Sequence, residues 1–261
     1  MKPIDLPRIE CIRTQPAAGV ESECSDCGRF CDTCAFSRAC LATGYGRREL
    51  AALHCLVEHV GLRAEGDYVF RRGEPFRAIY AVRSGSVKTS LFERDGREQV
   101  LGFYLPGEVV GLNGIYPERY PCDAVALGNA TLCRFSFPAM SELASTLPAV
   151  QQHLFRLLSR ELGMASLLAG DHTADERLAA FLLDLGERHG RRGLSATSFQ
   201  LPMSRSDMAN YLRLAPETVS RVFSRFRSRR WVAIEGRQLR LTDVDALRDL
   251  GTTSVQAAAR A

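Results

Sequence analysis

The spacing of apolar residues changes several times along the chain, and each change predicts a different kind of structure. Residues 1–46 have neither a helical nor a strand period and predict a loop-rich arm. From Arg47 to about Val60 the apolar residues recur at helical spacing, which predicts a short helix. These residues are Leu50, Leu53, Leu56, Val57 and Val60.

Between Gly61 and about Phe137 the pattern changes to short β-branched or aromatic runs that glycines separate. The runs cover residues 68–70, 78–82, 87–92, 99–103 and 130–135. Glycine is common in tight turns because it accepts a positive φ angle without a steric penalty. Short strands at such regular intervals predict a small antiparallel roll or barrel.

A long helical segment is predicted from Phe137 to Ala169, and Pro148 is expected to start its main helix. One face has the spacing of a coiled-coil seam. The seam residues are Phe155, Leu158, Leu162 and Ala165, and a neighbouring face carries Leu154, Leu157 and Leu168. A helix that is apolar on two faces needs two partners. Either both partners lie within one chain, or one face packs on the roll while the seam pairs with a second subunit, which is the arrangement we favour.

A second domain is predicted after residue 171. It starts with an amphipathic helix over residues 175–186, which a loop at residues 190–193 follows. Ser204 and Asp207 then have the spacing of a capping box, in which a hydroxyl and an acidic side chain satisfy the free amides at the start of a helix. This helix is expected to end at Leu212.

Another short helix is predicted after a break at Arg213 and Leu214, because Pro216 suits the first turn of a helix. Its buried side comprises Val219, Val222, Phe223 and Phe226. Two short helices joined by a tight turn are typical of a helix-turn-helix, whose second helix fits the major groove of DNA. Apolar runs at residues 232–234 and 239–241, with Gly236 between them, predict a two-stranded wing.

The charge distribution agrees with a DNA-binding role. The chain has a net charge of +4, yet residues 201–240 hold nine arginines and three acidic residues, a net charge of +6. Such a concentration favours a polyanionic partner, and double-stranded DNA is the usual one. Base contacts suit Glu217, Ser220 and Arg221, the last by a bidentate contact to guanine. Phosphate contacts are expected from Arg205, Arg225, Arg227 and Arg229.

The overall composition narrows the class of protein. A content of 46% hydrophobic and 25% charged residues is typical of a globular protein. No run reaches the roughly 18 apolar residues that a membrane helix needs, and the N-terminal residues lack the apolar core of a secretion signal. We therefore expect a cytoplasmic protein without membrane contact. No nucleotide-binding glycine loop and no conspicuous hydrolytic constellation occur, so an enzyme is not predicted.

Five of the nine cysteines fall close together near the N-terminus. They are Cys24, Cys27, Cys31, Cys34 and Cys40. In a long chain without an export signal, this clustering indicates metal or redox chemistry rather than a disulfide framework. Their spacing alone admits zinc as well as an iron–sulfur cluster. Cys11, Cys55, Cys122 and Cys133 are scattered, as buried small apolar residues often are.

An arm, a roll, a long helix and a winged helix-turn-helix together resemble the family of the cyclic AMP receptor protein and the fumarate and nitrate reduction regulator FNR. The resemblance covers roughly residues 27–250. The matching segments are the cysteines at positions 31, 34 and 40, Gly102-Phe103-Tyr104-Leu105, residues 175–181, and Glu217-Thr218-Val219-Ser220-Arg221. The chain is thus expected to have an α+β fold with a cyclic-nucleotide-binding-like antiparallel roll.

The resemblance to FNR proteins implies a [4Fe–4S] cluster held by Cys31, Cys34, Cys40 and Cys133. It also implies a homodimer that binds inverted TTGAT repeats when oxygen is scarce, and RNA polymerase as a partner. Oxygen would destroy the cluster, weaken the dimer and lower the affinity for DNA. Cyclic nucleotide is not expected, because Pro121 and Cys122 stand where the cyclic AMP receptor has an arginine and a small hydroxyl residue.

Several alternatives and departures accompany this interpretation. A structural zinc site would leave the DNA function intact, and an iron–sulfur redox enzyme or electron carrier is the alternative from another class. Cys24 and Cys27 have a competent ligand spacing as well, whereas the resemblance gives Cys122 no ligand role. Arg213 replaces the usual turn glycine, and Ala165 or a gap replaces an acidic seam residue in a helix that is shortened by about three residues relative to FNR.

We expect five parts along the chain. They are a cysteine-rich cluster-binding arm at residues 1–46, a roll that senses the signal at 47–147, a dimerisation helix at 148–170, a winged helix-turn-helix at 171–250 and a disordered tail at 251–261.

Overall fold

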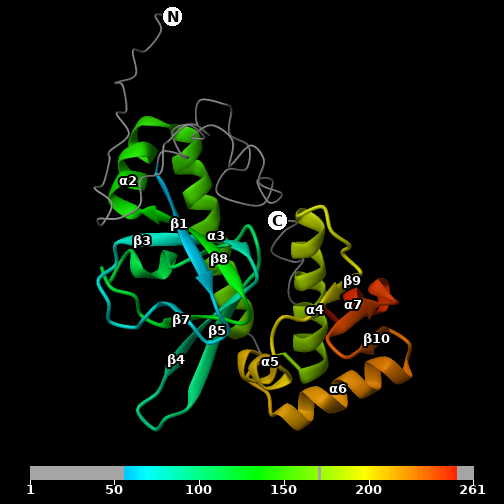
Figure 1. The fold of residues 1–261 in the computed structure, drawn as a ribbon. Helices are drawn as coiled ribbons and strands as arrows, with labels where there is room; N and C mark the ends of the chain where they lie inside the picture. Colours follow the sequence, from blue (N-terminus) through cyan, green and yellow to red (C-terminus); the bar gives the residue numbers. More distant parts are fainter. Residues whose placement is uncertain (1–55, 170–171, 252–261) are drawn as a thin grey trace, which may run out of the picture.

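The computed structural model describes residues 56–169 and 172–251 of the 261-residue chain. The predictions for the arm at 1–46, for its cysteines and for the last ten residues of the tail lie outside these ranges. In the described part, a β-roll with two helices is joined to a helical head that carries a small sheet (Figure 1). The α+β prediction is therefore confirmed.

Two four-stranded antiparallel sheets form the roll, in the orders β1-β8-β3-β6 and β2-β7-β4-β5. The strands are β1 (Val57–Arg63), β2 (Tyr68–Phe70), β3 (Ala78–Ser84), β4 (Val87–Phe92), β5 (Glu98–Tyr104), β6 (Val109–Val110), β7 (Asp123–Ala126) and β8 (Ala130–Ser136), and a short 3₁₀ helix, η1, covers Leu112–Gly114. Gly85 makes the β3–β4 turn with a φ of 73°, and a Cβ there would lie 2.3 Å from the carbonyl oxygen of Asn129. Only glycine fits this turn without displacing the backbone.

The five strands that the sequence predicts are confirmed, but one predicted helix is wrong where the structure describes it. Val57 and Val60 belong to β1 and not to a helix, and they pair with Phe135 and Leu132 of β8. The valines suit a strand because β-branched side chains pack well on a pleated sheet. The sequence analysis did not foresee β1, β6 or β7.

Two helices follow the roll, as predicted. They are α2 (Phe137–Thr146) and α3 (Pro148–Ala169). On α3 the side chains of Leu154, Leu157 and Leu158 pack against an apolar core that β3, β6, β8 and α2 form. Leu158 therefore packs within the chain, although the sequence placed it in the seam. Phe155 is 60% exposed and Leu162 is 71% exposed. The side chain of Ala165, the remaining seam residue, lies outside the described part of the chain.

The head consists of four helices and a three-stranded sheet in the order β10-β11-β9. The elements are α4 (Ala174–Arg191), β9 (Ser198–Gln200), α5 (Arg205–Tyr211), α6 (Pro216–Ser228), β10 (Val232–Glu235), β11 (Gln238–Leu241) and α7 (Val244–Gly251). The sequence predicts the helix-turn-helix of α5 and α6 correctly. The preceding helix, α4, extends five residues beyond the predicted end at Gly186, into the predicted loop. The two-stranded wing gains β9 as a third strand. Helix α7 occupies residues 244–250, which the sequence assigned to no element, and Gly251, which the sequence placed in the disordered tail. No helix in the described ranges is long and apolar enough to cross a bilayer.

Candidate nucleic-acid interface and metal ligands

The turn between α5 and α6 follows from local sequence chemistry. The capping box is complete, because the Asp207 amide donates to Ser204 Oγ at 2.9 Å and the Ser204 amide donates to Asp207 Oδ2 at 3.4 Å. At the end of α5 the Leu214 amide donates to the Ala209 carbonyl and the Arg213 amide to the Asn210 carbonyl, a pairing that defines a Schellman motif. The left-handed position of this motif is Arg213, with a φ of 56°.

Helix α6 begins directly after this turn and has one apolar face. Its buried side chains are Val219, Val222, Phe223 and Phe226. The helix ends in a second Schellman motif, in which the Trp231 amide donates to the Phe226 carbonyl and Arg230 has a φ of 58°. The apolar face fixes α6 to the head and leaves the opposite face to solvent.

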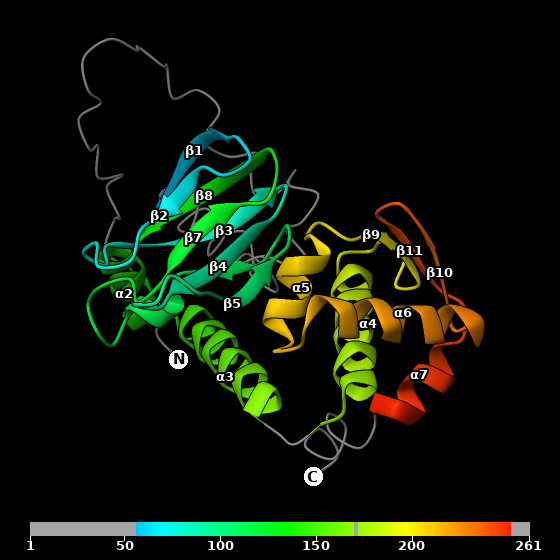
Figure 2. The same cartoon turned by 90° about the horizontal axis from the view of Figure 1, so that it is seen from below.

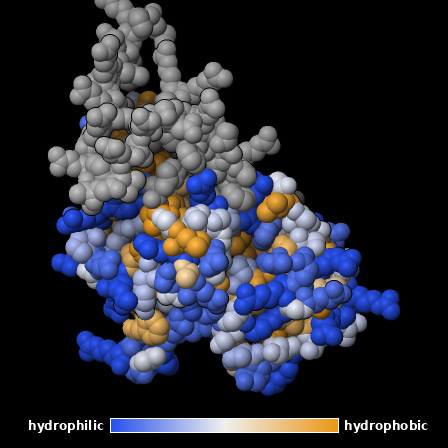
Figure 3. Space-filling model, in the orientation of Figure 1, coloured by the Kyte–Doolittle hydropathy of each residue, from blue (hydrophilic) through white to orange (hydrophobic). Residues whose placement is uncertain are grey.

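The exposed face of α6 carries the residues that the sequence assigns to base contacts. Glu217, Ser220 and Arg221 are all exposed, and they lie within the first two turns of the helix. Ser220 Oγ donates to the carbonyl oxygen of Pro216 at 3.0 Å, so its proton is used within the helix while its lone pairs remain able to accept. In Figure 3 the surface around α6 is dominated by hydrophilic residues.

The four arginines assigned to phosphates lie in different surroundings. The Arg205 guanidinium lies 3.8 Å from the centroid of the Phe223 ring, and burial lowers the pKa of Arg205 from its usual value. Arg225 forms an ion pair with Asp175 in the first turn of α4. Arg229 lies over the ring of Trp231 at 4.8 Å.

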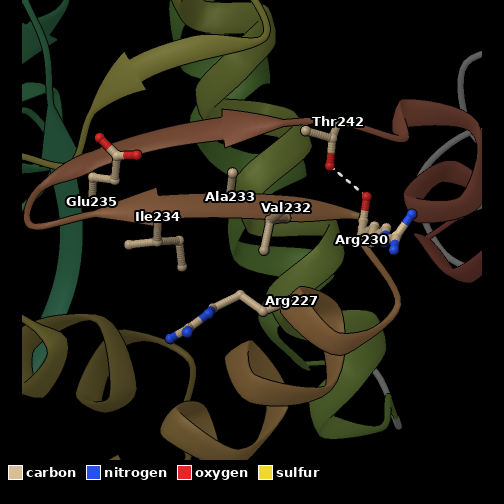
Figure 4. Close-up of a pocket in the computed structure, with 7 residues that line it drawn as sticks. All are labelled: Arg227, Arg230, Val232, Ala233, Ile234, Glu235 and Thr242. Carbon is tan, nitrogen blue, oxygen red and sulfur yellow. Dashed lines mark hydrogen bonds between the residues drawn. The ribbon is translucent and has the colours of Figure 1, made fainter.

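Arg227 lines a surface groove of about 510 Å³ between the last turns of α6 and the wing. The other lining residues are Arg230, Val232, Ala233, Ile234, Glu235 and Thr242. Figure 4 shows the Arg227 side chain extended beneath β10, with Ile234 and Val232 pointing toward it. Thr242 Oγ1 donates to the Arg230 carbonyl at 2.5 Å and ties the end of α6 to the wing. The groove thus contains two basic residues, Arg227 and Arg230, and one acidic residue, Glu235.

Comparison with known proteins identifies the family. The family models of a Crp-like helix-turn-helix domain and a cyclic nucleotide-binding domain match residues 176–250 and 63–146. The transcriptional activator protein Anr of Pseudomonas protegens is 40% identical over 229 residues, which is 87% of this chain and 94% of the relative. The chain belongs to the CRP/FNR family of transcription regulators.

Other CRP/FNR relatives agree with this assignment. The anaerobic regulatory protein of Haemophilus influenzae is 33% identical over 240 residues, which is 91% of this chain and 93% of the relative. FixK2 from Bradyrhizobium japonicum has a similar solved structure, with a TM-score of 0.66 and 29% identity over 74% of this chain and 96% of that one. The two relatives are named as a transcriptional activator and an anaerobic regulatory protein, and the Crp-like helix-turn-helix domain makes this chain a DNA-binding regulator and not an enzyme.

Two cysteines of the roll have very different surroundings. Cys133 is partly exposed on β8, where it pairs in register with His59 of β1 and Ala81 of β3. Cys122 is fully buried, and it accepts a hydrogen bond from Asn113 Nδ2 at 3.4 Å. Burial raises the pKa of the Cys122 thiol. Because metals bind the thiolate form, the partly exposed Cys133 is better suited to a ligand position than the buried Cys122.

The remaining predicted ligands cannot be placed in the fold. Cys31, Cys34 and Cys40 lie outside the described residues, as do Cys24 and Cys27. Within residues 56–169 and 172–251, no three His, Cys, Asp or Glu side chains are grouped to hold a metal ion. Strand β1 begins at Val57, two residues before His59, which pairs in register with Cys133.

Residues that join the head to the roll were missed by the sequence analysis. Lys88 binds Asp207 across 119 residues of sequence, and Arg188 binds Glu108 across 80. The amide of Asn210 reaches β5. The local sequence does not reveal these partners, because 80 to 119 residues separate them along the chain.

Proposed function

We propose that this protein is an oxygen-responsive regulator that binds DNA as a homodimer under low oxygen and carries a [4Fe–4S] cluster on Cys31, Cys34, Cys40 and Cys133. The observation that carries the proposal is the exposed face of α6, where Glu217, Ser220 and Arg221 stand together. These residues match the E-x-x-S-R motif that, by the resemblance to FNR proteins, reads an inverted TTGAT repeat, and the surrounding arginines suit its phosphates. Such a regulator acts in the cytoplasm, with RNA polymerase as its partner.

The surface of α3 supports a dimer. Phe155 and Leu162 are exposed, lie two turns apart on one helix face, and are large apolar residues of the kind that forms a coiled-coil seam. Two subunits paired along this face present two recognition helices to two half-sites. These half-sites are centred about 34–36 Å apart in an operator of this type.

The position of Cys133 in the fold supports its proposed role as the fourth ligand of the cluster. Four thiolates suit a [4Fe–4S] cluster, and such a group supplies an oxygen-labile centre when bound. Strand β8, which carries Cys133, ends at Ser136, where α2 begins and leads into α3. In this proposal the cluster joins the arm to β8 through Cys133. Helices α2 and α3 follow β8 directly, so loss of the cluster would reach the seam on α3 through them.

Two residues of the roll argue against a cyclic-nucleotide ligand. Pro121 is exposed and Cys122 is buried against Asn113, so neither residue offers a positive charge to a phosphate. The roll would therefore serve as a platform for the arm and not as a nucleotide receptor.

The test is anaerobic purification followed by air. We expect a brown protein with stoichiometric iron and sulfide that shifts DNA bearing inverted TTGAT repeats, and we expect air to remove both properties. Cys133→Ser should abolish the colour and the response to air, whereas Cys122→Ser should keep both. A colourless, air-stable protein with zinc would contradict the iron–sulfur assignment. Failure to shift DNA anaerobically would favour a redox protein instead.

A further inference from the structure

The head is attached to the roll by polar contacts along β5, the outermost strand of its sheet. Strand β5 pairs with β4 on one side only, and α5 lies beside its other edge (Figures 1 and 2). The outer edge of a sheet has unpaired backbone N–H and C=O groups that can form hydrogen bonds with another segment. We call the contacts that Lys88, Asn210 and Arg188 make here the head–roll junction.

The Asn210 side chain completes the free edge of β5. The Val100 amide donates to Asn210 Oδ1 at 2.7 Å, and Asn210 Nδ2 donates to the Glu98 carbonyl at 2.5 Å. A carboxamide that binds the N–H of one residue and the C=O of the second residue before it imitates a neighbouring strand. Asn210 belongs to the last turn of α5, and its own carbonyl accepts from Arg213 in the turn before α6.

Lys88 ties the start of α5 to the same sheet. Its Nζ lies 2.6 Å from Asp207 Oδ1 and 2.9 Å from Glu98 Oε1, and the three side chains are between 15% and 27% exposed. Burial acts to lower the pKa of Lys88, but hydrogen bonds to Asp207 and Glu98 outweigh it and raise the pKa. Asp207 is therefore shared between the helix cap and the roll.

Arg188 makes the third contact, from α4. Its Nε donates to Glu108 Oε1 at 2.8 Å and its Nη2 to the Phe103 carbonyl at 2.5 Å, with the side chain 7% exposed. The Phe103 ring packs on Tyr211 and Phe181 of the head, with centroids 5.3 and 6.1 Å apart. The junction thus combines partly buried polar contacts at three separate points with an apolar contact, and three separate points fix an orientation.

We propose that Asn210 is a positioning residue for DNA recognition, which acts with Lys88 and Arg188 to hold the recognition helix at one orientation relative to the roll. This inference rests on the proposed dimer, because two heads must be held at a fixed separation. A head held rigidly matches one half-site spacing, since one inserted base pair moves a half-site by about 3.4 Å and turns it by about 35°. A head on a loose connection would tolerate the change.

The test compares operators of correct spacing with operators that are one base pair longer or shorter. Asn210→Leu keeps the approximate volume and removes both hydrogen bonds to β5. We expect the parent to prefer the correct spacing strongly, and we expect this preference to fall roughly tenfold in Asn210→Leu because the effective concentration of the second head drops. Affinity for an isolated half-site should change less than twofold. Gln99→Ala, which removes an amide on the same strand outside the junction, should behave as the parent.

Hydrogen exchange checks the contact itself without DNA. The Val100 amide should exchange faster in Asn210→Leu than in the parent, while amides within β3 and β8 keep their protection. Unchanged exchange, an unchanged spacing preference, or an equal loss of half-site affinity would each overturn the positioning role. Sedimentation separates this result from the proposed function: a monomeric parent contradicts the dimer, whereas a dimeric parent that ignores spacing contradicts only the junction.

Discussion

The guanidinium of Arg205 stacks on the ring of Phe223, with 3.8 Å between its central carbon and the ring centroid. This contact joins the first helix of the helix-turn-helix to the apolar face of the second. The sequence assigned Arg205 to phosphate because of its charge and position. The structure adds a packing role, since the flat guanidinium covers a ring that belongs to the core of the head.

Arg205→Lys tests the packing role because lysine keeps the charge but not the planar stacking group. We expect the free energy of unfolding to fall by roughly 0.5–1 kcal/mol. Urea unfolding followed by the fluorescence of Trp231, the single tryptophan, reports on the head directly. Arg237→Lys, at an exposed position of the wing, serves as the control. Equal losses in the two variants would refute a specific role for stacking.

Arg225 is expected to exchange one anion for another when DNA binds. It is paired with Asp175, although it was assigned to a phosphate. Asp175→Asn removes the competing carboxylate, so DNA affinity should rise on the order of twofold to fivefold. Arg225→Gln should lower the affinity and reduce the slope of log K against log salt by about 0.9. DNA titrations at several salt concentrations measure the affinity and the slope. An unchanged slope in Arg225→Gln would show that Arg225 does not contact a phosphate.

Replacement of Arg213 by glycine should stabilise the head. Arg213 has a φ of 56° in the turn between α5 and α6, and a side chain with a Cβ is strained there. Arg213→Gly is expected to raise the free energy of unfolding by about 1 kcal/mol. Arg213→Ala removes the charge but keeps the Cβ, so it should leave stability nearly unchanged. Equal stabilisation by both variants would mean that the side chain, and not the backbone, is the cause.

Helix α3 offers a direct test of the seam. Phe155→Lys places a charge at a 60% exposed apolar position, and we expect it to shift the protein from dimer to monomer in sedimentation experiments. Affinity for a complete operator should fall with it. Ala149→Lys introduces the same charge at an exposed position in the first turn of α3 and should leave the dimer intact. A dimeric Phe155→Lys protein would place the interface elsewhere.

The parts of the fold that depend on neighbouring residues could be predicted from the sequence. Ser204 and Asp207 specify a helix start by themselves, and the apolar face from Val219 to Phe226 specifies α6. Val57 was misassigned because its helical spacing is ambiguous, while its actual partner, Phe135, lies far along the chain. The same distance hides the binding of Lys88 to Asp207. Local rules cannot reveal contacts that only the tertiary fold creates.

His189 should make the stability of the head fall in mild acid. Its ring stacks on Phe199, with centroids 4.7 Å apart, and its Nε2 is buried without a hydrogen-bond partner in the described part of the chain. Burial, and then the charges of Arg192 and Arg188, lower the pKa of His189 to about 4. An unfolded chain holds this histidine near its ordinary pKa of about 6.5.

Between these two pKa values His189 is protonated in the unfolded state and neutral in the folded state. The free energy of unfolding therefore falls as the pH drops from about 6.5 to 4. Because the ring is partly exposed, solvent screening reduces the loss attributable to His189 to about 1 kcal/mol at pH 5. His189→Phe keeps the stacked ring and removes the titration. Its unfolding free energy, measured by Trp231 fluorescence, should match the parent at pH 7.5 and exceed it at pH 5. Parallel pH profiles for the two proteins would show that His189 is not the group responsible.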